Sequence, residues 1–300
     1  MATATDVIER TSEPPHLRVG ARLRELAAHR EILANLVRKE LKVKYVASVL
    51  GAIWSLLNPA VYLAVFTLVF RVVLANRIPG YPVFLLSGLL PWNLFSVSVT
   101  SATRSVVDNA NLVKKVYFPR EVLPVAGIGV ALVDLLLQSL VLVAFMVATG
   151  WRFHPEALPL YPLAFAALLL FTTAVALLLA AANVRYRDVQ HLLALALLVW
   201  FWMTPIVYPA ALVQGSPHEL FGVRLFHLYL LNPLVLVISG FQRALYGAVR
   251  PPGAGGPILL DVSVGWLAAG LALVAAASAV LLYLTWRLFF RLSGDFAEEL

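Results

Sequence analysis

The stretch SVVDNANLVKKVYFPR, residues 105–120, is a polar interruption between two long apolar segments. It carries Lys114, Lys115 and Arg120 in a chain of which only 13% of the residues are charged. Charged side chains are costly inside a bilayer and favour water or another protein. Because the segment on either side is long enough to cross a bilayer, the stretch predicts a loop that joins two transmembrane helices.

The composition is that of an integral membrane protein. The 300 residues are 61% hydrophobic, with a mean hydropathy of +0.86, and several apolar runs exceed the roughly 18 residues that a spanning helix needs. The net charge of +7 could suggest nucleic acid, but the basic residues flank the apolar runs, where they orient the chain and contact anionic lipids. The absence of cysteine excludes disulfides, thiolate metal sites and thiol catalysis.

Six apolar segments predict an all-α fold with six transmembrane helices, within a transmembrane domain of residues 53–289. The segments are residues 53–75, 83–104, 122–148, 158–183, 190–208 and 262–286. With both termini in the cytosol, 17 of the 23 Lys and Arg residues lie on the cytosolic side, as the positive-inside rule requires.

The remaining segments have distinct predictions. Residues 1–20 are expected to be a disordered cytosolic tail, and residues 290–300 a second cytosolic tail. Residues 21–52 predict an amphipathic helix whose apolar stripe lies in the acyl boundary of the cytosolic interface. Residues 209–261 predict an external region with short re-entrant or interfacial helices, because Asn232 and Pro233 interrupt its apolar run.

Asp134 lies near the middle of the third predicted span, and Gln138 shares its helical face. A carboxylate at that depth has to face protein or water. No Lys, Arg or His is expected at a comparable depth within the spans. A structural hydrogen bond between helices is therefore favoured over a proton relay.

Several catalytic signatures are missing from the chain. There is no GxxxxGK[ST] phosphate loop and no HExxH motif, the histidines are isolated, and the carboxylates are scattered along the sequence. We therefore expect no catalysis and no ATPase site in this chain, and no metal or cofactor of its own.

Several motifs resemble one family: LVRKELKVKYVASVLGAIWSLLNP (36–59), LLPWNLFSVSV (89–99), NANLVKKVYFPREVLPV (109–125), RYRDVQHLL (185–193) and FAEEL (296–300). From about residue 30 to the end, the chain resembles the permease subunits of bacterial ABC exporters for lipid-linked polysaccharides (O-antigen, capsule, galactan) or teichoic acid. The resemblance implies a multi-pass protein of the bacterial cytoplasmic (inner) membrane. It also implies a homodimer that binds two copies of a separate nucleotide-binding ATPase, which holds ATP and Mg²⁺.

In the family, the loop between the second and third spans is a coupling helix that docks on the ATPase, and a second cytosolic loop adds contacts. Carried over, these roles fall on Asn111, Leu112, Lys114, Lys115, Tyr117, Phe118, Pro119 and Arg120, and on Arg185, Tyr186, Arg187 and Asp188. An exposed Tyr-Phe pair would supply aromatic anchors and the cations would orient them. The alternative is that the cations only determine topology, which leaves the two aromatic residues unexplained.

The resemblance further implies an undecaprenyl-diphosphate-type lipid-linked glycan as substrate. Aromatic faces suit a sliding sugar polymer, and the channel candidates are Trp54, Asn58, Tyr62, Phe66, Phe70, Trp92, Trp200, Trp202 and Tyr208. Candidates for holding the lipid phosphate are Arg38, Lys39, Lys42 and Lys44. Helix packing, an aromatic belt and a simple positive-inside anchor remain open as alternatives, as do a drug or small-lipid exporter of the same fold and a membrane enzyme of glycolipid synthesis. No role with nucleic acid is expected.

Overall fold

The structure is a computed structural model that describes residues 19–46, 57, 60, 61, 64, 65, 68, 69, 78–151, 154–220, 222–247, 249–253 and 255–300. Most of the tail predicted for residues 1–20 lies outside the described residues. So does most of the span predicted for residues 53–75, so these two predictions stay predictions.

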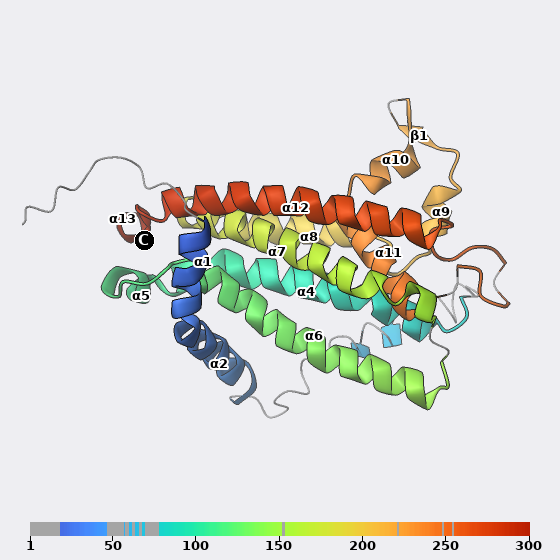
Figure 1. Ribbon diagram of the computed structural model, residues 1–300, viewed down its shortest axis with the longest axis horizontal. Coiled ribbons are helices and arrows are strands. Elements are labelled where there is room, and N and C mark those ends of the chain that lie inside the picture. The colour runs from blue at the N-terminus through green and yellow to red at the C-terminus, as the bar shows by residue number, and fades with distance from the viewer. Residues whose placement is uncertain are drawn as a thin grey trace, which may run out of the picture.

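Four long helices run side by side and form the body of the molecule (Figure 1). They are α4 (Tyr81–Asp108), α6 (Val122–Ala148), α7 (Leu160–Arg185) and α12 (Val264–Leu292). Each is long and apolar enough to cross a membrane. Four of the six predicted spans therefore coincide with long apolar helices, and the bounds of α6 match those predicted.

The central helix of this bundle is α4. It packs against α6, α7, α8 and α11, and 78% of its most apolar stretch is buried, against 22% for α12. The helix continues through Pro91 and starts after Gly80, whose positive φ of 61° suits glycine. Nearly the whole surface of α4 is therefore covered, apart from one face.

Two helices of the bundle are shorter. α8 (Val189–Trp202) has 14 residues, or about 21 Å of helix, which is less than the roughly 30 Å of a hydrocarbon core. The predicted helix over 190–208 is thus wrong after Trp202, because the chain bends through Thr204 and Pro205 instead of staying helical.

α11 (Pro233–Leu245) is buried among α4, α7 and α12 at one end of the bundle (Figure 1). The preceding helix, α10 (Leu225–Leu230), ends before Asn232, whose Oδ1 accepts a hydrogen bond from the Leu234 amide at 3.1 Å. The predicted break at Asn-Pro is confirmed, and the 13 residues of α11 are too few to span on their own.

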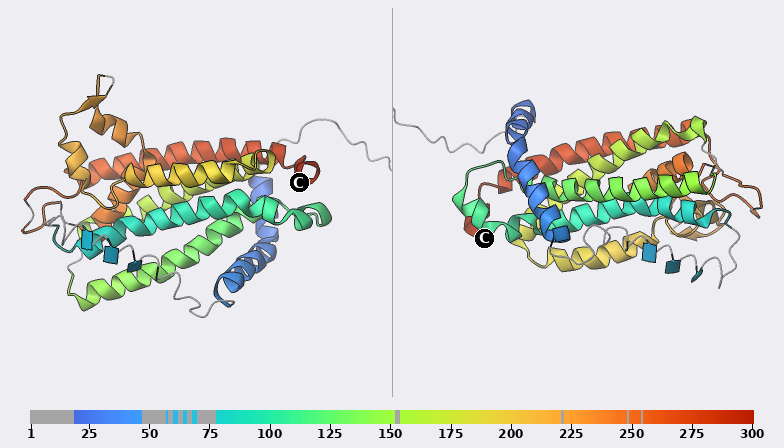
Figure 2. Two further views of the ribbon diagram at one scale, coloured as in Figure 1. Left: turned by 180° about the vertical axis from the view of Figure 1, so that it is seen from behind. Right: turned by 90° about the horizontal axis from the view of Figure 1, so that it is seen from below.

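The small elements gather at the two ends of the bundle. α5 (Ala110–Lys115) and α13 (Phe296–Glu299) lie at one end, beside α1 (Val19–Ala28) (Figures 1 and 2). At the other end are α9 (Ala210–Gln214) and the hairpin of β1 (Glu219–Leu220) and β2 (Val223–Arg224), and the 3-10 turn η2 (Pro155–Ala157) precedes α7.

The predicted amphipathic helix is two helices rather than one. α1 ends at Ala28 and α2 (Arg30–Val46) begins after His29, so the chain turns between them while crossing the end of the bundle (Figure 1). Their apolar residues Leu26, Leu33 and Leu36 pack on a protein core formed by α4, α6, α7 and α12. The expectation that this stripe lies in the acyl boundary is therefore wrong for these three residues, which contact protein.

Candidate functional site

The polar stretch that divides the second and third spans is exposed at the end of the bundle. One residue, Asn109, separates α4 from α5. Its side chain donates to the Ser105 carbonyl in the last turn of α4 at 2.8 Å. Asn111, Lys114 and Lys115 are exposed on α5. Beyond it, the ring of Tyr117 is 92% exposed. A single aromatic side chain thus stands on a basic surface, as a protein-docking anchor does.

Phe118 lies on the opposite side of the same segment. It is 5% exposed and belongs to the core cluster that contains Val113, Phe289 and Phe296. The predicted exposed Tyr-Phe pair is therefore wrong for Phe118, and Pro119 is buried as well. Among residues that the sequence reasoning did not select, Val116 is 48% exposed beside Tyr117.

Two further residues of the stretch are partly covered. Leu112 packs on the same core cluster, and Arg120 is half-buried. Burial lowers the pKa of Arg120, while the charge of Glu121 acts in the opposite direction. The exposed docking candidates on this segment reduce to Asn111, Lys114, Lys115 and Tyr117.

Glu121, the residue that follows the stretch, is the centre of a buried polar contact that we call the Glu121 cluster, with Arg22 and Trp286. Its carboxylate is 1% exposed and accepts two hydrogen bonds from Arg22, at 2.9 Å from Nε and 2.7 Å from Nη2. The Trp286 indole donates to it at 3.2 Å. Three segments, α1, the end of the loop and α12, therefore meet at one carboxylate.

Arg22 is held on its other sides too. Its Nη1 lies 2.6 Å from Glu25, and its guanidinium lies 4.9 Å from the centre of the Phe290 ring. Burial alone would lower the pKa of Arg22, but the hydrogen bonds and charges of Glu121 and Glu25 together outweigh burial and raise it. The sequence signal for this cluster is weak, since Arg22 and Glu121 are separated by 99 positions.

The second predicted cytosolic contact lies at the same end of the molecule. Arg185, Tyr186, Arg187 and Asp188 are all exposed between α7 and α8. The Arg185 Nε lies 3.9 Å from a carboxylate oxygen of Glu299 in α13, and α13 in turn packs against α5. Residues from three separate motifs therefore form one surface.

The cations of α2 divide into two groups. Arg38, Lys39 and Lys42 are exposed, and their one hydrogen bond within the described part of the chain is a long contact of 3.5 Å from Lys39 to Asn109. Lys44 instead places its ammonium 2.6 Å from Asp134 of α6.

The same carboxylate accepts a hydrogen bond from the Tyr45 hydroxyl at 2.6 Å. The expectation that no cation reaches the depth of Asp134 is thus wrong, and the Lys44 charge pairs with protein rather than a lipid phosphate. The expected structural role of Asp134 between helices fits this geometry.

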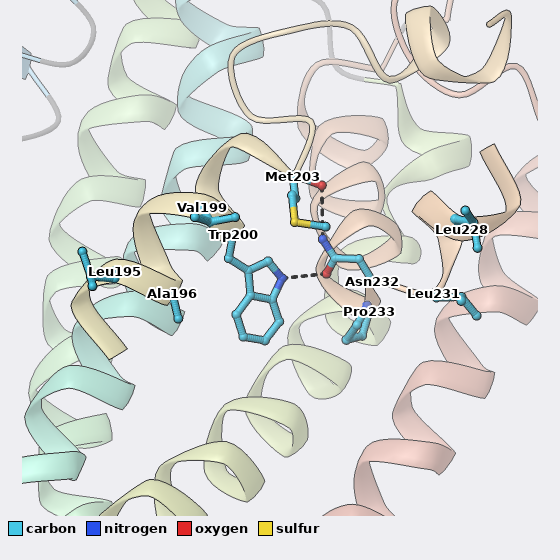
Figure 3. Close-up of a pocket in the computed structure, with 9 residues that line it drawn as sticks. All are labelled: Leu195, Ala196, Val199, Trp200, Met203, Leu228, Leu231, Asn232 and Pro233. Carbon is cyan, nitrogen blue, oxygen red and sulfur yellow. Dashed lines mark hydrogen bonds between the residues drawn. The ribbon is translucent and has the colours of Figure 1, made fainter. Parts of the chain in front are cut away.

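At the opposite end, an apolar groove of about 660 Å³ runs between α8 and the α10–α11 junction (Figure 3). Trp200 borders it and donates its indole hydrogen to Asn232 Oδ1 at 2.9 Å, while Asn232 Nδ2 donates to the Met203 carbonyl at 3.2 Å. Trp202 is 52% exposed nearby, and the Tyr208 hydroxyl donates to the Trp202 carbonyl at 3.1 Å. Trp200, Trp202 and Tyr208 therefore lie at the same end of the bundle, and their role as channel residues stays a prediction.

Trp92 does not join them. It is 6% exposed, and its ring packs edge-on against Phe201 with ring centres 5.5 Å apart, so in this structure it belongs to the core and lines no channel. The other channel candidates, Trp54, Asn58, Tyr62, Phe66 and Phe70, lie outside the described residues. Within the described ranges, no group of three His, Asp or Glu side chains is placed to bind a metal ion.

Comparison with known proteins finds one family and several relatives. Residues 32–246 match the family described as ABC-2 type transporter. The O-antigen export system permease protein RfbA of Myxococcus xanthus is 34% identical over 280 residues, which cover 93% of this chain and 98% of the relative. RfbA of Klebsiella pneumoniae is 31% identical, covering 73% and 82%. The polysialic acid transport protein KpsM of Escherichia coli is 22% identical, covering 69% and 78%.

Proposed function

Because this chain belongs to the ABC-2 type transporter family, we propose that it is the permease subunit of an ABC exporter that moves O-antigen or a related polysaccharide across the bacterial inner membrane, in which it is a multi-pass protein. The observation that carries the proposal is the 34% identity to an O-antigen export permease over nearly the full length of both chains. The two relatives at lower identity also have names that refer to glycan export or transport. Export of drugs or small lipids and an enzymatic role in glycolipid synthesis are not favoured by these relatives.

The finer assembly is part of the same proposal. Two copies of the chain pair with two copies of a separate ATPase, which binds ATP and Mg²⁺, so that this chain needs no nucleotide or metal of its own. The substrate is a glycan on an undecaprenyl-diphosphate-type lipid, and a teichoic acid is the alternative cargo. Exposed Arg38, Lys39 and Lys42 support a place for the lipid diphosphate near α2.

Six spans with both termini in the cytosol remain the proposed topology. Four long helices support it directly, and α8 followed by the bend at Thr204 supplies a shorter fifth crossing. The basic α5 and the segment that ends in α13 lie at one end of the bundle, which agrees with a shared cytosolic side (Figure 2).

The ATPase docks, in this proposal, on the surface formed by α5, Tyr117 and residues 185–188. Tyr117 enters a pocket of the ATPase, and Lys114 and Lys115 orient the approach. The exposure of all three side chains supports these roles, while buried Phe118 supports the segment from beneath. The path for the glycan includes Trp200 and Trp202 in the last turn of α8 and Tyr208 in the segment that follows it.

The export function is tested by deleting the gene in the bacterium that carries it. We expect the surface polysaccharide to disappear while its lipid-linked precursor accumulates inside the cell, and we expect a plasmid copy to restore export. An unchanged amount of surface polysaccharide in the deletion strain would contradict the proposal.

The docking surface is tested by reversing the charges of Lys114 and Lys115 to Glu in the complex with its ATPase. Substrate-stimulated ATP hydrolysis should be lost, because the docking partner then meets the wrong charge. Arg224→Glu, an exposed cation at the opposite end, is the matched control. Equal ATP turnover in both variants would refute the assignment.

A further inference from the structure

The exposed faces of three spans are almost entirely apolar. On α6 they include Leu136, Leu140 and Val147, which are 66–70% exposed. On α8 and α12 the same kind of face carries Leu195 and Leu284, which are 64% and 54% exposed. Such faces suit lipid tails or an apolar neighbour.

The exposed face of the central helix α4 has the opposite character. Within its membrane-crossing part it consists of Asn93, Ser96, Thr100, Ser101 and Arg104, which we call the polar face of α4, with Val97 between them. The spacing of three and four positions places these residues in one row along the helix. Ser96, Thr100, Ser101 and Arg104 border an open hollow of about 280 Å³.

Three side chains of this face, Thr100, Ser101 and Arg104, make no side-chain hydrogen bond or ion pair with the described residues. Thr100 and Arg104 are also exposed. A cation within a spanning helix is expensive unless it faces water or a polar partner. Lipid tails cannot satisfy either group, so the face needs polar surroundings.

Other polar groups of the bundle lie on the side where α4 meets α6. Asn93 donates to Gln138 of α6 at 3.3 Å. One turn from Gln138, Asp134 receives the ammonium of Lys44 and the hydroxyl of Tyr45. The polar face of α4 is therefore the exposed part of a larger polar zone rather than an isolated run of hydroxyls.

We propose that the polar face of α4 is a wall of the water-filled path through which the sugar polymer passes, an inference that rests on the proposed export function. Hydroxyl side chains both donate and accept hydrogen bonds, so Ser96, Thr100 and Ser101 can exchange partners with successive sugar hydroxyls. Water can bridge positions where the fit is imperfect.

Arg104 has a separate role in this path. It lies one turn before Asp108, where α4 ends at the α5 end of the bundle. A guanidinium there can bind a phosphate with two parallel hydrogen bonds, so it meets the anionic head of the lipid carrier or a charged sugar at the mouth of the path. The face therefore selects a hydroxyl-rich polymer with an anionic end.

The chain has no cysteine, so each single-cysteine variant carries one thiol, and label is counted on this chain after it is separated from the other proteins. Ser96→Cys and Thr100→Cys are compared with Leu140→Cys and Leu284→Cys on the apolar faces. The full complex, in membrane vesicles, is treated with a charged thiol reagent that does not cross lipid.

Because only the thiolate reacts and lipid keeps a thiol protonated, positions 96 and 100 should react at least about tenfold faster than position 140. Labelling at position 100 as slow as at position 140 would overturn the inference.

A second comparison tests whether the polymer uses this path. Vesicles from cells that make the lipid-linked glycan should show slower labelling at position 100 than vesicles from cells in which glycan synthesis is blocked. Equal rates would overturn the role of the face in glycan passage.

Surface polysaccharide is measured in the same strains. If export is normal but positions 96 and 100 are not labelled, the polar face of α4 does not line the path, and the export function still stands. If deletion of the gene for this chain leaves the amount of surface polysaccharide unchanged, the export function on which the inference rests is refuted.

Discussion

Replacing Arg22 with Ala should destabilise the protein far more than its position in a short terminal helix suggests. The change removes the cation of the Glu121 cluster and leaves the Glu121 carboxylate, 1% exposed, with only the Trp286 indole as a hydrogen-bond donor among the described residues. Losing one partner of a buried ion pair costs about 3–5 kcal/mol, because the remaining charge stays buried without compensation. The loss comes mainly from Glu121, since the Glu25 contact is more exposed.

The expected shift in melting temperature is large enough to measure. About 3 kcal/mol corresponds to roughly 5 °C in a chain of 300 residues, and the ranking of the variants is the criterion. Arg24→Ala is the matched control, because Arg24 is an exposed cation on the same helix and, among the described residues, donates only to the Gly20 carbonyl. It should shift the melting temperature by little.

A second substitution identifies the cause. Glu121→Gln in the Arg22→Ala background removes the uncompensated charge while keeping the shape, so it should recover part of the lost stability, as a double-mutant cycle measures. The assay is thermal unfolding of the purified protein in detergent, followed by its intrinsic fluorescence. If Arg22→Ala melts at the same temperature as Arg24→Ala, the cluster does not stabilise the fold and the reasoning is refuted.

Three other changes test separate contacts. Tyr117→Ala should weaken binding to the ATPase by about 2 kcal/mol, or roughly thirtyfold, at an unchanged melting temperature, because the ring is 92% exposed; equal affinity in a binding titration would exclude it as an anchor. Gly129→Ala would place a methyl group 2.7 Å from the Val37 side chain and should cost about 1–3 kcal/mol of stability. A second substitution, Val37→Ala, should restore that stability in thermal unfolding. Failure of this rescue would contradict the close approach of α2 to α6. Asn232→Ala removes the hydrogen-bond acceptor for Trp200 and the N-cap of α11, so it should lower the stability of the fold by about 1–3 kcal/mol. A melting temperature equal to that of the unsubstituted protein would contradict this.

Long apolar runs made much of the bundle predictable from sequence. α6 begins and ends where its apolar run does, at Val122 and Ala148, because no proline or polar cluster interrupts its second half. The end of the helix predicted over 190–208 was harder to predict, because apolar residues continue through a bend that starts near Thr204. Hydrophobicity reports burial in lipid or protein, but it does not report where the backbone stops being helical.

Side-chain partners were beyond the reach of sequence patterns. Glu121 and Asp134 find their cations 99 and 90 positions away, at Arg22 and Lys44, and no local spacing connects them. The burial of Phe118 has a simpler cause. The helix α5 ends at Val116, where the backbone is extended, and the chain bends at Phe118, so Tyr117 faces outward while Phe118 packs into the core.

The same geometry links the docking surface to the proposed path. Only Asn109 separates α5 from α4, and its side chain bonds back to the last turn of α4 at the Ser105 carbonyl. At the other end of the loop, Glu121 holds the chain to α1 and α12. A displacement applied at Tyr117 must therefore either rotate the Glu121 cluster or move α4, and breaking the cluster costs several kcal/mol. Moving α4 shifts its polar face directly, so the surface that would receive the force and the surface that would meet the polymer belong to one continuous helix.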